Sequence, residues 1–110
     1  MLESRLLHKT ASYLLHKVDW FDLPNEWKHH GLNEELNFTL ILSFVDQHFP
    51  HAEVLYFVDQ RTNSRAIDRK ELQDALDSLI GQSNFFLWNT EITKVIEFNE
   101  MGVLRLGKIP

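Results

Sequence analysis

The clearest pattern in the chain is an alternation of apolar and polar residues near its C-terminus. Residues Phe85–Trp88 form a short apolar run, and residues Ile92–Phe98 then alternate with the period of two that a pleated strand requires. The loop Asn99–Gly102 contains a glycine that can adopt positive φ, and residues Val103–Leu106 resume the strand pattern. We therefore expect a C-terminal β-hairpin, which needs an apolar cover over one face because two strands alone are unstable in water.

Two segments have the helical period instead. Apolar residues recur at steps of three and four along Leu2–Val18, which predicts an amphipathic helix of about four turns. A second helix is predicted to begin at Asp68, where Asp68 and Glu71 can form a capping box. Gly81 is well placed just beyond its last turn. Its buried stripe would consist of Leu72, Ala75, Leu76, Leu79 and Ile80.

The segment Leu36–Val45 fits both a strand and a helix. Its apolar residues alternate as in a strand, but they also recur on one helical face. Asn33 can cap a helix whose first turn carries Glu34 and Glu35, where the helix dipole favours anions. These features favour a helix that is apolar nearly all round, and therefore central, and that Pro50 would end.

A further strand is predicted at Glu53–Asp59, which is apolar on both faces and therefore interior to the sheet, with a loop following at Arg61–Arg65. The order strand–helix–strand from Val54 to Trp88 is compatible with one parallel crossover. We therefore predict one α+β domain over residues 1–110, with three or four helices packed on a small mixed β-sheet that ends in a C-terminal β-hairpin.

Composition narrows the possible functions. Of the 110 residues, 44% are hydrophobic and 25% are charged, which is typical of a globular protein. The absence of cysteine excludes a disulfide framework, a thiolate zinc site and a cysteine nucleophile. The N-terminus lacks the pattern of a signal peptide, and no apolar run approaches the length of a membrane span. We therefore expect a cytoplasmic protein without membrane contact.

The net charge of −5 argues against general affinity for nucleic acid, because contact with phosphates supplies most of that binding energy. This charge fits simple solubility, which is the commoner explanation, or a partner with a basic surface.

The chain contains no motif for catalysis or metal binding. His29 and His30 are adjacent, so on a helix they would point about 100° apart and could not ligate one metal from the same face. His48 and His51 lie on either side of Pro50, a spacing that belongs to no common metal site. We therefore expect no metal, no cofactor and no enzymatic activity.

Some acids remain available for acid–base chemistry, which requires carboxylates in different environments. The segment Glu91–Lys94 is loosely similar to the acid-and-lysine arrangement of nucleases, but its spacing is one residue too long. A small hydrolase that uses Asp59 or Glu97 is therefore the third hypothesis for function. The acids at element ends or in strands are Asp46, Glu53, Asp59, Glu91 and Glu97.

The segment Asp19–Trp27 is rich in acids and tryptophan, with no basic residue before Lys28. Asp22 and Pro24 favour the entry to a short helix that Gly31 would end. The commoner role for the two indoles is to fill the core between helix and sheet. The functional alternative is a contact surface for a basic partner, with tryptophan anchors and surrounding carboxylates.

Although the chain is acidic overall, one group of four basic residues lies in a predicted loop and at a predicted helix start. Its most frequent explanation is a solvated loop with salt bridges. The alternative function is a small regulatory or nucleic-acid-binding module that contacts anions at the helix N-terminus. The residues concerned are Arg61, Arg65, Arg69 and Lys70.

In overall build, in the segment Asp19–Trp27 and in closing β segments such as Lys94–Asn99, the chain resembles the immunity proteins of bacterial toxin systems, including those of contact-dependent growth inhibition. The resemblance implies a non-catalytic protein that binds the C-terminal domain of a secreted toxin, often a basic nuclease, and covers its active site. On this hypothesis Trp20 and Trp27 would be anchors. The acids that imitate substrate phosphates would be Asp19, Asp22, Glu26, Glu34 and Glu35.

Overall fold

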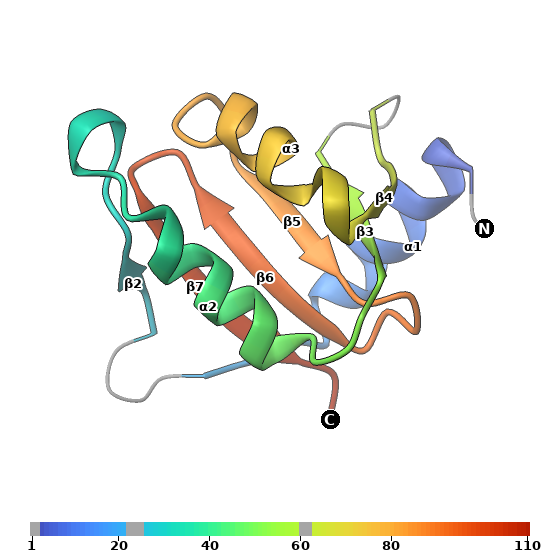
Figure 1. The fold of residues 1–110 in the computed structure, drawn as a ribbon. Coiled ribbons are helices and arrows are strands. Elements are labelled where there is room, and N and C mark those ends of the chain that lie inside the picture. Colours follow the sequence, from blue (N-terminus) through green and yellow to red (C-terminus); the bar gives the residue numbers. More distant parts are fainter. Residues whose placement is uncertain (1–2, 22–25, 60–62) are drawn as a thin grey trace.

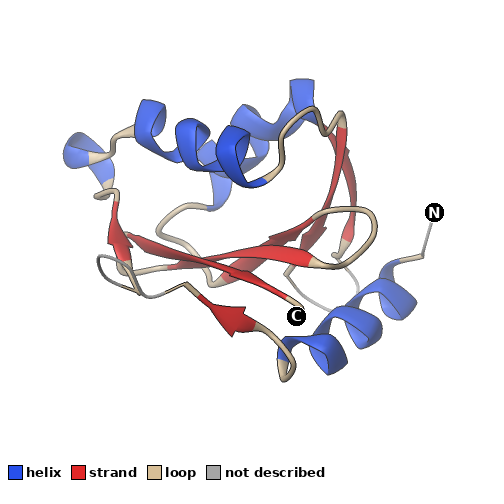
Figure 2. Ribbon diagram, turned by 90° about the horizontal axis from the view of Figure 1, so that it is seen from below, coloured by secondary structure: helices blue, strands red, loops and turns tan. Residues whose placement is uncertain are grey.

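The computed structural model describes residues 3–21, 26–59 and 63–110, which form helices on both sides of one β-sheet (Figures 1 and 2). The helices are α1 (Ser4–Leu15), α2 (Phe38–His48) and α3 (Leu72–Leu79), with the 3-10 turns η1 (Asn33–Glu35) and η2 (Arg69–Glu71). The strands are β1 (Asp19–Trp20), β2 (Lys28–His29), β3 (Val54–Val58), β4 (Arg65–Asp68), β5 (Phe85–Trp88), β6 (Lys94–Asn99) and β7 (Val103–Lys108). The predicted α+β class is confirmed.

The sheet separates two apolar clusters. Figure 1 shows α2 and α3 side by side over one face, and Figure 2 shows α1 on the opposite face. The larger cluster lies under α2 and α3 and includes Phe57 and Phe98, and the smaller one lies under α1 and includes Trp88. Because both faces are covered, the interior strand β3, which lies between β5 and β4, is buried from Leu55 to Val58, as predicted.

The predicted parallel crossover from β3 to β5 is wrong. The strand order is β1-β7-β6-β5-β3-β4, with β2 also on β7, and β3 pairs antiparallel with both β4 and β5. The unpredicted strand β4 causes the difference, because residues 65–68, expected to be a loop and a helix start, pair with β3 instead. The chain therefore enters α3 from β4, on the far side of β3, and crosses over β3 to reach β5.

The helix predicted at Leu2–Val18 is confirmed as α1. The Glu3 side chain caps it by accepting a hydrogen bond from the backbone N–H of Leu6, at 2.9 Å. Leu7 and Ala11 are buried against the sheet.

The ambiguous segment 36–45 belongs to a helix, α2, but two details of its prediction are wrong. The cap is Asn37, whose side chain accepts from the Leu40 N–H at 3.0 Å, whereas Asn33 begins the separate turn η1 at a left-handed φ of 54°. The helix is also not central. Ile41 and Val45 pack on the sheet, and the opposite face is exposed because it carries the polar residues Thr39, Ser43, Asp46 and Gln47.

The helix predicted from Asp68 is present as α3, but its expected capping box does not form. Asp68 pairs with Val54 in the β3–β4 ladder, and the turn η2 separates it from α3, so its side chain makes no cap hydrogen bond. Gly81 follows the helix with φ of 85°, as expected of a residue just beyond a helix end.

The short helix expected between Asp22 and Gly31 is wrong over its described part. Residues Lys28–His29 instead form β2, which pairs with one end of β7 while β1 pairs with the other. The predicted entry at Asp22 and Pro24 lies outside the described residues. Pairing with β1 and β2 satisfies backbone groups that an edge strand would otherwise expose.

Candidate partner-binding surface

The outer edge of the sheet is covered by residues 19–21 and 26–35, which we call the edge segment. The edge segment is held to the sheet by Arg105 of β7. On the α1 side of the sheet, the side chain of Arg105 lies against two indole rings of the segment. The Arg105 guanidinium carbon lies 3.8 Å from the ring centre of Trp20 and 4.6 Å from that of Trp27. Each such contact is worth about 0.5–2 kcal/mol, depending on how far the cation is desolvated.

Two carboxylates complete the environment of Arg105. Its Nε donates to Glu97 Oε1 at 2.7 Å, across the β6–β7 ladder in which the two residues are paired. Its Nη1 donates to Glu26. The Arg105 side chain is 22% exposed, so these bonds are only partly screened by water. One cation thus joins two indoles and two acids, and it positions the edge segment against the sheet.

The structure brings together three residues of the predicted surface, namely Trp20, Glu26 and Trp27. Asp19 lies on the other side of the sheet, because neighbouring strand residues point to opposite faces. Trp20 pairs with Gly107 and packs in the α1 cluster, whereas Asp19 pairs with Lys108. Asp22 lies outside the described residues.

The two remaining predicted acids, Glu34 and Glu35, are exposed in the turn η1. The backbone N–H groups of His30 and Gly31 donate to the Gly102 carbonyl, at 2.9 and 3.1 Å, so η1 lies beside the β6–β7 turn. Gly31 has φ of 81°, and a Cβ there would lie 2.3 Å from the Glu35 carbonyl oxygen, so glycine is required. A shallow hollow of about 560 Å³ is lined by His29, Leu32, Asn33, Glu34, Glu35 and Met101.

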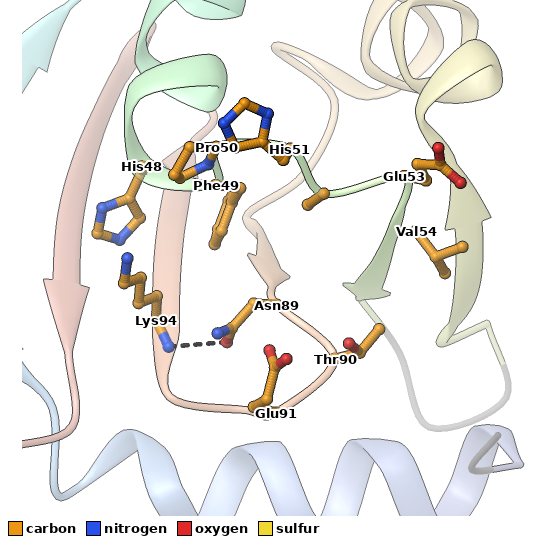
Figure 3. A pocket seen from close by; sticks show the side chains of 11 residues that line it. His48, Phe49, Pro50, His51, Glu53, Val54, Asn89, Thr90, Glu91 and Lys94 are labelled. Carbon is orange, nitrogen blue, oxygen red and sulfur yellow. Dashed lines mark hydrogen bonds between the residues drawn. The ribbon is translucent and has the colours of Figure 1, made fainter.

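A second hollow, which we call the α2-end pocket, lies between the C-terminus of α2 and the β5–β6 loop (Figure 3). Its volume is about 360 Å³. It brings together His48, His51, Glu53, Glu91 and Lys94, which the sequence presents as separate groups. The edge segment reaches its border, because the Phe21 ring makes an edge contact with His48 at 5.6 Å between ring centres.

Two buried histidines have lowered pKa values. Burial is the main cause that lowers the pKa of His48, and the charge of Lys94 lowers it further, while a 2.9 Å hydrogen bond to the Gly107 carbonyl acts in the opposite direction. Burial also lowers the pKa of His30, against a 2.9 Å contact of its Nδ1 with the Gly31 carbonyl. Because a carbonyl only accepts, the bonded ring nitrogen carries the proton in both residues.

Two of the four residues of the predicted basic group are engaged in local contacts. Arg65 lies over the Phe57 ring at 5.1 Å, and Arg69 pairs with Asp46 at 3.1 Å and donates to the Phe49 carbonyl. Lys70 is exposed. Arg61 lies outside the described residues.

Arg105 and the α2-end pocket were not predicted from the sequence. A charged residue within the apolar run Val103–Leu106 was the available signal for Arg105. Counting the hairpin register from the loop 99–102 places it opposite Glu97. No comparable signal exists for the pocket, because its walls, residues 48–54 and 89–94, are brought together only by the sheet order.

Comparison with known proteins adds no functional assignment. No protein-family model, no curated protein and no solved structure matches this chain. Within the described ranges, no group of three or more histidine or acidic residues is arranged to hold a metal ion. No helix in the same ranges has both the length and the apolarity to cross a bilayer.

Proposed function

We propose that this chain is a non-catalytic binding protein of the toxin-immunity type. It neutralises a bacterial toxin domain in the cytoplasm by placing an acidic surface over a basic active site, such as that of a nuclease. The observation that carries the proposal is the stack of Trp20, Arg105 and Trp27 with its two carboxylates.

The stack supports this function because it fixes the edge segment before any partner arrives. A preformed surface loses less conformational entropy on binding than a loop that must first become ordered. The acids Asp19, Glu34 and Glu35 are exposed along this edge. Glu26 is paired with Arg105, so its main role is to position the segment, while the exposed acids attract the partner.

A growth assay tests the proposal directly. The probe is the toxin domain encoded in the reading frame next to the gene for this chain. Co-expression of the chain should restore growth of cells that express this domain. A neighbouring frame without a toxin domain, or a toxin whose effect is unchanged by co-expression, would contradict the immunity function.

Association kinetics test the proposed surface. The double substitution Glu34→Lys/Glu35→Lys should slow association with the toxin domain about tenfold at low salt, because attraction between charges accelerates encounter. The difference should shrink at about 0.5 M salt, where charges are screened beyond a few ångströms. Asp68→Lys/Glu71→Lys is the matched control, since it changes charge equally at exposed acids in β4 and η2, at the opposite edge of the sheet from the edge segment. Equal slowing in both variants would contradict this placement of the interface.

A further inference from the structure

The α2-end pocket has walls from two segments that the fold fixes independently. Residues 48–54 leave α2, turn at His51 with φ of 63° and enter β3. Residues 89–94 join β5 to β6, and their turn also contains a left-handed residue, Ile92, with φ of 54°. Two of the three left-handed non-glycine residues in the described ranges therefore lie in the walls of this pocket. Such backbone is retained where the surrounding structure stabilises it.

Asn89 stabilises the second wall. Its Oδ1 accepts from the backbone N–H groups of Thr93 and Lys94, and its Nδ2 donates to Thr93 Oγ1, each at 2.8 Å. Ile92 is 9% exposed and packs in the α1 cluster. Since both ends of the turn are fixed, the position of Glu91 between them is also fixed. Figure 3 shows the Glu91 carboxylate pointing into the pocket.

The charges around the pocket favour a cation. Glu91 and Glu53 are exposed carboxylates at its border. The partial negative charge at the C-terminus of α2 is met by Arg69, which donates to the Phe49 carbonyl at 3.2 Å, so the two carboxylates are the groups that attract a further cation. Among the described residues, Lys94 is the only lysine or arginine in the lining. Its side chain lies along the opposite wall and points toward His48, whose pKa its charge lowers (Figure 3). The side of the pocket that carries Glu91 is therefore negative.

We propose that the α2-end pocket binds the guanidinium group of an arginine side chain on the protein partner, with Glu91 as the carboxylate that contacts it. This inference rests on the proposed function for the identity of the partner. A guanidinium group matches a carboxylate through two parallel hydrogen bonds and is weakly hydrated, so arginine fits better than lysine. Pro50, which is exposed in the lining beside the buried Phe49, offers apolar surface to the stem of a long side chain.

The test uses a small probe, N-acetyl-arginine methylamide, added to the full ¹⁵N-labelled chain. We expect saturable changes in the backbone amide resonances of residues 49, 51–54 and 89–94. The citrulline analogue has nearly the same shape without the charge, so it should bind at least about tenfold more weakly. Glu91→Gln should weaken arginine binding by a similar factor, whereas Glu100→Gln, at an exposed acid in the β6–β7 turn, should leave it unchanged.

Equal binding of the arginine and citrulline probes, or shifts that do not map to these two segments, would overturn the proposal. So would unchanged arginine binding by the Glu91→Gln variant. The probe contains no toxin, so this result is independent of the growth assay. Arginine binding without neutralisation would leave the pocket intact and remove the proposed function. Neutralisation of the toxin without arginine binding would support the proposed function and overturn the proposed arginine pocket.

Discussion

Arg105 connects the edge segment to the sheet through four side chains, and its removal tests that role. Arg105→Ala leaves Glu26 and Glu97 without their shared cation and leaves the two indoles without their stacking partner. We expect the free energy of unfolding to fall by about 2–4 kcal/mol, near the range for breaking a partly buried ion pair. Urea unfolding followed by tryptophan fluorescence measures this change. Arg5→Ala, at an exposed position on α1, is the control and should change stability by no more than about 0.5 kcal/mol.

His48 gives the protein a dependence on pH. Its folded-state pKa is lowered from the ordinary 6.5, so the unfolded chain binds a proton first as the pH falls. The stabilisation is therefore complete above about pH 6.5 and is lost as the pH falls through the lower folded-state pKa. His48→Gln can keep the hydrogen bond to the Gly107 carbonyl without titrating. Its urea midpoint should fall less between pH 7.5 and pH 5.5 than that of the unmodified protein. The control is His16→Gln, at an exposed histidine, whose urea midpoint should change with pH as in the unmodified protein. If the midpoints of His48→Gln and the unmodified protein fall equally, groups other than His48 cause the pH dependence.

The helix starts provide a matched test at the level of secondary structure. Asn37 makes a cap hydrogen bond at the start of α2, whereas Asp68 makes none near the start of α3. Asn37→Ala should therefore lower the free energy of unfolding by about 1 kcal/mol. Asp68→Ala should change it by less than about 0.5 kcal/mol. Thermal or urea unfolding of the two variants decides this, and a larger loss at Asp68 would show that its side chain stabilises the helix after all.

The helices and strands with a long, regular pattern of apolar residues could be predicted from the sequence. The short strands that depend on pairing with a neighbouring strand could not. The stripe of α1 and the apolar run of β3 identify these elements locally, because each buries its own side chains. In contrast, β4 and β2 are short and have mixed polarity, so only an adjacent strand determines that they are extended. The same reason separates Asp19 from Trp20. The acidic, tryptophan-rich segment was visible in the sequence, but its division between two faces follows from pairing with β7.

At the scale of the whole molecule, the helices on the two sides of the sheet differ in charge. The exposed cations Arg5, Lys9 and Lys17 lie on or just after α1, whereas α3 carries the exposed acids Asp74 and Asp77 on the other side. The net charge of −5 therefore does not describe every face of the molecule, because α1 carries exposed cations and α3 carries exposed acids. The cations on α1 would repel a basic partner that approached over that helix, which leaves the outer edge with Glu34 and Glu35 as the favoured approach.

This difference in charge leads to a prediction that separates the proposed function from nucleic-acid binding. Arg65 and Arg69 are engaged in local contacts, and the helix that follows them in the chain, α3, carries exposed acids. Because binding to nucleic acid depends on neutralising several phosphates at once, we expect no retention of RNA or DNA in a filter-binding titration at about 50 mM salt. Retention that weakens steeply with added salt and is abolished by Arg65→Gln/Lys70→Gln would favour the basic group as the functional surface. The same result after Arg5→Gln/Lys9→Gln alone would instead assign the contact to α1.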